Sequence, residues 1–152
     1  MSPTPLILLP PSEGKASGGE GPPLDLDTLS FESLNKTRAQ MAKSVSQLSG
    51  KPRVSQKLLG VKGIALETAR ADNASLMDTP TMSAIERYTG VMYDSIDYKS
   101  LDADAKECFD QSTIILSGLF GMVRPYDMIP TYKLKMGAKL RRNRTCAAIW
   151  KP

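Results

Sequence analysis

The sequence contains no histidine, only two cysteines and few aromatic residues. Without histidine the chain cannot assemble a Ser-His-Asp triad, a Cys-His pair or a histidine-ligated metal site. Cys108 and Cys146 are too few and too far apart for a disulfide framework or a CxxC metal motif, which favours a reducing cytoplasm. Any catalysis would depend on carboxylates, Lys, Arg, Tyr, Ser or Cys, and we expect neither a cofactor nor a metal site.

Long hydrophobic runs are also absent. The longest apolar run near the start, Leu6 to Leu9, is too short for the hydrophobic region of a signal peptide. With 152 residues, of which 41% are hydrophobic and 24% charged, the composition is that of one globular domain. It excludes a disordered tail, a coiled-coil rod and a membrane protein, so we expect a cytoplasmic protein with no membrane partner.

Charge of one sign is scarce or absent at each end of the chain. Residues 1–35 hold five acidic residues and Lys15 as the one base, whereas residues 130–152 hold seven bases and no acid. The basic end favours a polyanionic partner such as nucleic acid or a phosphorylated ligand. Equally, a neighbouring or missing segment could neutralise it.

Two short apolar runs, Leu6 to Leu9 and Thr113 to Leu116, predict strands buried on both faces at the centre of a sheet. If these strands are parallel, the loops that follow them emerge on the same side. The alternation of Tyr132, Leu134 and Met136 with lysines predicts a half-exposed strand with a basic outer face.

Helical spacing predicts helices from the N-cap Asn35 to about Ser49, over residues 54–59, and from Ile64 onward. Thr79 and Pro80 have the pattern of a helix start, so a helix is predicted to run to near Gly90. Another helix is expected to begin at Asp102, with Cys108 on its buried face, and a last helical turn is predicted over residues 145–150. The unfinished last helix and the basic end predict that residues 1–152 are the amino-terminal part of a larger α+β domain.

A glycine turn between two short helices is the most mechanistic signal in the chain. Such a turn can present backbone N–H groups to a phosphate at the start of the second helix, with lysines adding charge. The candidate DNA-binding residues are Lys57, Gly60, Val61, Lys62 and Gly63. Lys62 is inserted into the usual glycine–apolar–glycine form, and in the alternative interpretation Gly60 is simply a helix C-cap and the turn is structural.

Polar and aromatic residues at loop positions suggest a pocket for a small anion. The candidates are Ser12, Lys15, Tyr88, Thr89, Gly90, Ser117, Arg124 and Tyr132. Lys15 and Arg124 would bind the anion, and Tyr88 or Lys15 would act as acid or base. In the alternative interpretation Tyr88 is a packing residue and Arg124 an intramolecular clamp for carbonyl groups or Asp127.

Several segments in order along the chain resemble the YaaA family of peroxide-stress proteins, especially an actinobacterial-like branch. They are residues 8–15 (LLPPSEGK), 21–24 (GPPL), 86–93 (ERYTGVMY), 117–125 (SGLFGMVRP) and 129–137 (IPTYKLKMG).

The resemblance implies a mixed β-sheet surrounded by helices, with a helix-hairpin-helix element beside a positively charged cleft. It also implies a cytoplasmic protein that binds double-stranded DNA, limits free iron and so limits oxidative damage. We therefore expect an α+β protein that contacts the phosphate backbone of duplex DNA without sequence preference. The alternatives are an enzyme acting on a small anionic substrate in the Lys/Arg/Tyr pocket, and a folded remnant without activity.

Overall fold

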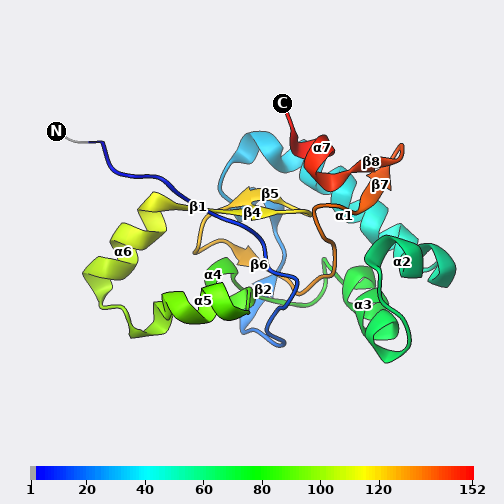
Figure 1. Cartoon of the computed structure of the whole chain (residues 1–152), viewed down its shortest axis with the longest axis horizontal. Helices are drawn as coiled ribbons and strands as arrows, with labels where there is room; N and C mark the ends of the chain where they lie inside the picture. Colours follow the sequence, from blue (N-terminus) through cyan, green and yellow to red (C-terminus); the bar gives the residue numbers. More distant parts are fainter. Residues whose placement is uncertain (1–2) are drawn as a thin grey trace.

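The computed structural model describes residues 3–152 as an α+β fold around a small mixed sheet (Figure 1). This sheet has the order β1 (Ile7–Leu9), β4 (Thr113–Ser117), β5 (Gly121–Val123). β1 and β4 are parallel, with Leu8 opposite Ile114, and β4 and β5 are antiparallel. The two strands are neighbours and run parallel, which meets the condition for their following loops to emerge on the same side, so their carboxyl ends lie at the same edge of the sheet.

The prediction that β1 is buried on both faces is wrong. β1 is an edge strand, and the side chains of Leu6 and Leu8 are 59% and 57% exposed, whereas Leu9 is buried. β4 has a hydrogen-bonded neighbour on each side and Ile115 is fully buried. The difference follows from position in the sheet, because within residues 3–152 no strand pairs with the outer edge of β1.

A second sheet has the order β2 (Gly21–Pro23), β3 (Pro80–Ser83), β6 (Met128–Ile129), and its strands are antiparallel. The prediction of a helix starting at Thr79 is therefore wrong for residues 80–83, which form β3. The helix that follows, α4 (Ala84–Arg87), is only one turn long. Thr81 pairs with Gly21, and its hydroxyl donates to the Pro22 carbonyl at 2.7 Å. Pairing with a distant segment thus overrides the local helix-start signal.

The strand predicted through Tyr132, Leu134 and Met136 is also absent from the described structure, although Tyr132 and Leu134 are buried as the alternation requires. The segment is held by a side chain instead of a strand. The Asn73 amide nitrogen donates to the Lys133 carbonyl at 2.9 Å, and its oxygen accepts the Lys133 N–H at 2.9 Å. These two bonds anchor the backbone at Lys133, between the buried side chains of Tyr132 and Leu134.

The longer helices occupy the predicted regions. They are α1 (Asn35–Ser49), α2 (Pro52–Leu59), α3 (Ile64–Ala74), α5 (Val91–Ile96), α6 (Ala103–Ser112) and α7 (Cys146–Trp150), with 3-10 turns η1 (Leu26–Thr28), η2 (Glu32–Leu34) and η3 (Tyr98–Ser100). In Figure 1, α5 and α6 lie on one side of the central sheet, and α2 and α3 lie at the other end of the molecule.

Two details of these helices differ from expectation. Asn35 is the first helical residue and Leu34 is the N-cap, and the Asn35 side chain accepts a hydrogen bond from Arg38 and does not cap the helix. Cys108 is exposed and not part of the core. Asp102 does cap α6, where its carboxylate accepts the Ala105 N–H at 2.8 Å.

The remaining strands, β7 (Lys139–Arg141) and β8 (Arg144–Thr145), form a basic hairpin against α1. Arg142 and Asn143 turn this hairpin with positive φ angles. The Arg141 guanidinium donates to the Gln40 side chain on α1. Across residues 3–152, no helix combines the length and the apolar character needed to cross a membrane.

Candidate functional site

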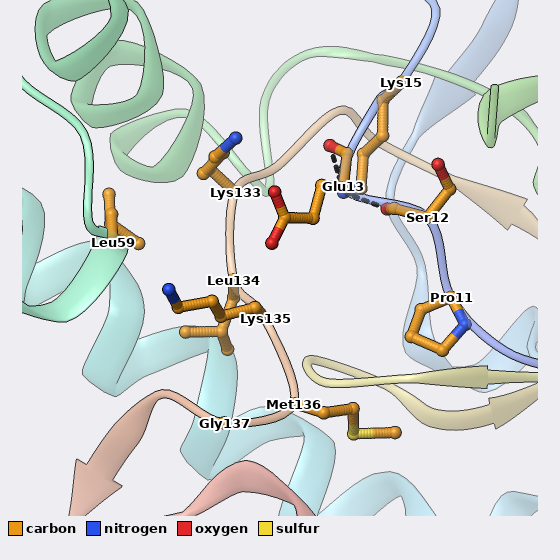
Figure 2. A pocket seen from close by; sticks show the side chains of 10 residues that line it. All are labelled: Pro11, Ser12, Glu13, Lys15, Leu59, Lys133, Leu134, Lys135, Met136 and Gly137. Atoms are coloured by element: carbon orange, nitrogen blue, oxygen red, sulfur yellow. Dashed lines mark hydrogen bonds between the residues drawn. The ribbon is translucent and has the colours of Figure 1, made fainter. Parts of the chain in front are cut away.

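A cavity of about 330 Å³ lies where the chain leaves β1 and where residues 133–137 pass the end of α2 (Figure 2). Its lining combines apolar side chains with three lysines and one carboxylate. The lining residues are Pro11, Ser12, Glu13, Lys15, Leu59, Lys133, Leu134, Lys135, Met136 and Gly137. The loop after β1 therefore does form a pocket, as the sequence predicts for the carboxyl end of a parallel strand.

The β1 loop is fixed against residues 87–89 by backbone hydrogen bonds. The Ala16 N–H donates to the Arg87 carbonyl at 2.8 Å, and the Thr89 N–H donates to the Gly14 carbonyl at 3.1 Å. The Ser12 hydroxyl donates to the Thr89 carbonyl. These contacts bring four of the predicted site residues, Ser12, Lys15, Tyr88 and Thr89, together in space.

The Lys15 amine lies over two tyrosine rings. Its Nζ is 4.2 Å from the centre of the Tyr132 ring and 5.4 Å from that of Tyr88, and it donates to the Ser12 carbonyl at 3.2 Å. Such contacts hold a cation over aromatic faces. The position of the amine is thus set by the ring faces and the backbone of its own loop.

Beneath Lys15, three buried hydroxyls form a chain. The Tyr88 and Tyr132 hydroxyls are 2.5 Å apart, and the Tyr132 and Ser117 hydroxyls are 2.8 Å apart. Burial raises the pKa of both tyrosines, so they stay protonated at neutral pH. These hydroxyls join Tyr88, whose backbone pairs with Lys15, to Ser117 at the end of β4, and so bring Ser117 and Tyr132 into the predicted cluster.

Gly90 lies at the rim of this cluster. Its φ is +120°, which an L-residue rarely adopts, and a Cβ at this position would come within 3.3 Å of the Ser12 hydroxyl. The glycine lets the chain turn from Thr89 into α5 while staying close to the β1 loop.

The pKa of the Lys15 amine is lowered from 10.5 to about 8, chiefly by burial and also by the positive charges of Lys133 and Arg87, while Glu13 opposes the shift. Between pH 8 and 10.5 the unfolded chain therefore holds a proton here that the folded chain has released. The folded state gains stability as the pH rises through this window.

Replacing Lys15 by methionine removes this titration. We expect the free energy of unfolding of the parent protein to rise relative to that of Lys15→Met as the pH increases from 8 to about 10.5. Urea unfolding across this range measures the difference, with Lys57→Met as the control at an exposed lysine. A difference that stays constant over the range would show that Lys15 titrates as an ordinary lysine.

Arg124 does not belong to this pocket, and the prediction that it converges with Lys15 is wrong. Its guanidinium donates to the carbonyls of Gln111 at 3.0 Å and Thr113 at 3.1 Å. Thr113 begins β4, whereas the pocket residue Ser117 ends it. Its backbone N–H donates to the Asp127 carboxylate at 2.8 Å. Because β5 runs antiparallel to β4, the residue after β5 lies beside the start of β4, so Arg124 acts as the intramolecular clamp of the alternative interpretation.

Sequence reasoning missed Lys133, Lys135 and Glu13 as pocket residues. The basic alternation of residues 132–136 was the available signal, but it placed the lysines on the outer face of a strand. In the structure the lysines line the space that Lys15 enters, and Figure 2 shows the Glu13 carboxylate reaching into the same space. The cations that line the cavity with Lys15 are thus Lys133 and Lys135, not Arg124.

The glycine turn lies between α2 and α3, as predicted. Gly60 has a φ of +69° and its N–H donates to the Gln56 carbonyl at 2.9 Å, so it is a left-handed helix C-cap. Lys57, Lys62 and Gly63 are exposed, and Val61 is half-buried. A Cβ at Gly60 would lie 3.2 Å from the Lys135 amine. The turn therefore borders the cavity lined by Lys15, Lys133 and Lys135, which we call the lysine pocket.

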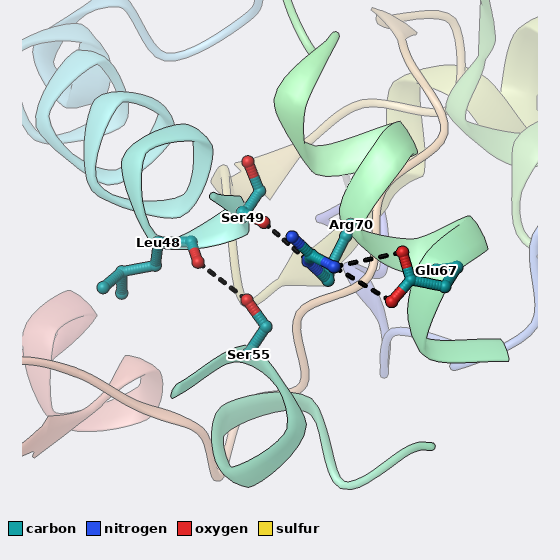
Figure 3. Close-up of polar contacts among 5 residues, drawn as sticks. All are labelled: Leu48, Ser49, Ser55, Glu67 and Arg70. Atoms are coloured by element: carbon teal, nitrogen blue, oxygen red, sulfur yellow. Dashed lines mark hydrogen bonds and ion pairs between the residues drawn. The ribbon is translucent and has the colours of Figure 1, made fainter. Parts of the chain in front are cut away.

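Polar contacts fix α1, α2 and α3 relative to one another (Figure 3). The Ser55 hydroxyl on α2 donates to the Leu48 carbonyl at 2.7 Å, and Arg70 on α3 donates to the Ser49 carbonyl at 2.8 Å. Arg70 also forms an ion pair with Glu67 at 2.9 Å. The turn is therefore presented by a fixed pair of helices.

Comparison with known proteins gives the context of this site. A family model described as "Peroxide stress protein YaaA" matches residues 6–152. A UPF0246 protein of Streptomyces coelicolor is 40% identical over 148 residues, which cover 96% of this chain and 56% of that relative. A UPF0246 protein of Corynebacterium glutamicum is 42% identical over 135 residues, covering 89% and 52%, and an uncharacterized protein of Campylobacter jejuni is 33% identical over 137 residues, covering 88% and 54%.

The chain spans about half the length of these curated relatives. The family match nevertheless includes the β1 loop, the glycine turn and both lysines of residues 133–135. A family model matched over nearly the whole chain establishes membership, and the actinobacterial relatives agree with it. The chain belongs to the YaaA family of peroxide stress proteins.

Proposed function

We propose that this chain binds duplex DNA through backbone phosphates, along a surface that runs from the glycine turn to the lysine pocket. The observation that carries the proposal is the convergence of Lys15, Lys133 and Lys135 on one cavity bordered by Gly60. Within residues 3–152, none of these three lysines has a carboxylate oxygen within 4.0 Å of its amine; the ion pair found there joins Arg70 and Glu67. The lysines are therefore available to an external anion. Such clustering of cations favours a polyanion.

The first turn of α3 adds hydrogen-bond donors to this surface. The first backbone N–H groups of a helix have no partner within the helix, and the helix dipole gives this end partial positive charge. α3 begins at Ile64, which is 87% exposed, directly after the exposed Lys62 and Gly63. A phosphate at this end would meet backbone donors and a lysine together.

The basic hairpin continues the surface along the chain. Lys139 and Arg144 are exposed on β7 and β8, and one residue, Ala138, separates the pocket residue Gly137 from β7. Contacts of this kind position a protein on the duplex without reading its sequence. Family membership supports a cytoplasmic role in the peroxide-stress response, in which DNA binding accompanies the limitation of iron-dependent damage.

Charge reversal of the turn tests the proposal. The double variant Lys57→Glu/Lys62→Glu should bind duplexes of different sequence more weakly and to the same extent, because phosphate contacts carry no base information. The slope of log affinity against log salt concentration should become shallower by about one for each phosphate that the variant no longer binds. Fluorescence anisotropy with several labelled duplexes, each titrated over a series of salt concentrations, measures both.

The matched control is Lys99→Glu/Lys106→Glu, which makes the same change of charge on η3 and α6, on the side of the molecule away from α2 and α3 (Figure 1). It should keep most of the parent affinity and salt slope. Equal losses of affinity in the two double variants would mean that overall charge, and not the turn, governs binding.

A second candidate function is supported by the Lys15 environment. The cavity of about 330 Å³ combines an amine of lowered pKa with two further lysines and a carboxylate, on an apolar wall. These are the components of an enzyme site for a small anionic substrate, with Lys133 and Lys135 binding the anion in place of Arg124. Binding of a small ligand does not require DNA, which separates the two candidates.

A further inference from the structure

We propose that Lys15 is an amine nucleophile that forms an imine with the carbonyl group of a small anion bound in the lysine pocket. The inference rests on the second candidate function and names its substrate class, a ketone that carries a carboxylate or a phosphate.

The position of the amine supports this role. Lys15 Nζ donates to the Ser12 and Glu13 carbonyls at 3.2 and 3.4 Å, over the ring of Tyr132, and it lines the cavity. Within residues 3–152 it has no carboxylate within 4.0 Å. An amine held by carbonyls and ring faces can be deprotonated without breaking an ion pair.

The other lysines supply the site for the anionic group of the ligand. Lys133 and Lys135 line the same cavity from a segment pinned by Asn73, and Leu59 and Met136 add apolar surface beside them. The positive charge of Lys133 also disfavours the protonated form of Lys15. A neighbouring cation is a recognised way to activate a lysine nucleophile.

The step requires no oxidant or reductant. The lone pair of neutral Lys15 Nζ attacks the carbonyl carbon, a C–N bond forms and the π electron pair moves to oxygen. The nitrogen loses two protons in succession to that oxygen, which leaves as one molecule of water as the C=N bond forms. The Glu13 carboxylate, which lines the cavity, can accept each proton from nitrogen and pass it to oxygen.

Reductive trapping tests the inference. The protein is incubated with 2-oxoglutarate, or in a parallel arm with dihydroxyacetone phosphate, in the presence of cyanoborohydride, and the labelled peptides are identified by mass. We expect labelling at Lys15 at least about tenfold above labelling at the exposed Lys57 and Lys62. The arm that labels faster identifies whether the anionic group is a carboxylate or a phosphate.

The rate of labelling should rise as the pH increases toward about 8 and then level off, because the pKa of Lys15 is about 8. Lys15→Arg should lose the label, whereas Lys62→Arg should keep it. The variant Lys133→Gln/Lys135→Gln should slow labelling of Lys15 at low ligand concentration. Because the comparison of sites is made within the parent protein, it holds even if a variant fails to fold.

Labelling of Lys15 no faster than that of Lys57 in both arms would overturn the imine inference. A second measurement separates this result from failure of the site itself. It asks whether 2-hydroxyglutarate, which has no ketone, protects Lys133 and Lys135 from an acylating reagent. Protection without trapping means that the pocket binds anions but Lys15 forms no imine. The absence of both protection and trapping would contradict the second candidate function as well as the inference.

Discussion

Replacing Arg87 by methionine is expected to lower the free energy of unfolding by about 3 kcal/mol or more. Arg87 is fully buried, and its guanidinium donates to the carbonyls of Ala16 at 2.7 Å, Gly18 at 2.9 Å and Ile129 at 3.2 Å, and to that of Pro80 at 3.3 Å. Methionine fills a similar volume but donates no hydrogen bond, so buried carbonyls lose their partner.

Urea unfolding at pH 7 measures this loss of stability. Arg53→Met is the control, because Arg53 is exposed on α2 and the same substitution there should change stability by no more than about 0.5 kcal/mol. Because Arg87 ties the β1 loop to β3 and β6, its removal should also loosen the lysine pocket. Equal stability of the two variants would show that the four carbonyls find other partners.

The substitution Gly121→Ala is the second change with a large expected effect, a destabilisation of about 2–4 kcal/mol. Gly121 has a φ of +77°, and a Cβ there would lie 2.6 Å from the Trp150 ring. The ring is held by a hydrogen bond from its Nε1 to the Gly118 carbonyl at 2.8 Å, so it cannot move away without breaking that hydrogen bond. Alanine at this position adds both a strained backbone angle and an overlap.

Two comparisons separate these causes. A Cβ at Gly137 meets nothing within 4 Å, so Gly137→Ala should change stability little. Trp150→Ala removes the ring, so adding Gly121→Ala to that background should cost only the backbone strain, about 1 kcal/mol. Thermal unfolding of the single and double variants gives the coupling between the two positions. Full additivity would mean that the ring does not resist the added Cβ.

Local signals in the sequence predicted much of the fold. The apolar runs located β1 and β4, Asp102 marked the start of α6, and the helical turn predicted over residues 145–150 matches α7. Each of these signals acts through neighbouring residues or through a burial pattern that the sequence displays directly. The helices on either side of the glycine turn followed from spacing alone.

Features that depend on distant partners could not be predicted. Residues 80–83 form β3 because they pair with β2, where Thr81 bonds Pro22 across 59 positions of the chain, although Thr79 and Pro80 resemble a helix start. Burial of β1 could not be judged from its composition, because exposure depends on whether a neighbouring strand covers its edge. We expected a strand buried at the centre, and Leu6 and Leu8 are exposed.

The candidate site was predicted only in part, because some of its residues are also positioned by distant partners. Lys15 and Ser117 come to one edge because β1 and β4 are parallel, and hydroxyl hydrogen bonds and ring contacts add Tyr88 and Tyr132 to the cluster. Arg124 was misplaced because the antiparallel return of β5 carries it to the opposite end of β4. Lys133 and Lys135 reach the pocket because Asn73, which is 60 residues away from Lys133 in sequence, anchors their segment.

The salt dependence of duplex DNA binding by the parent protein tests the central claim most directly. If phosphates occupy the surface formed by Lys57, Lys62, Lys133 and Lys135, log affinity should fall linearly with log salt concentration, with a slope of about −3.6 or steeper and the same value for unrelated sequences. A slope near zero, or no detectable duplex binding at about 50 mM salt, would contradict the assignment of this surface to DNA.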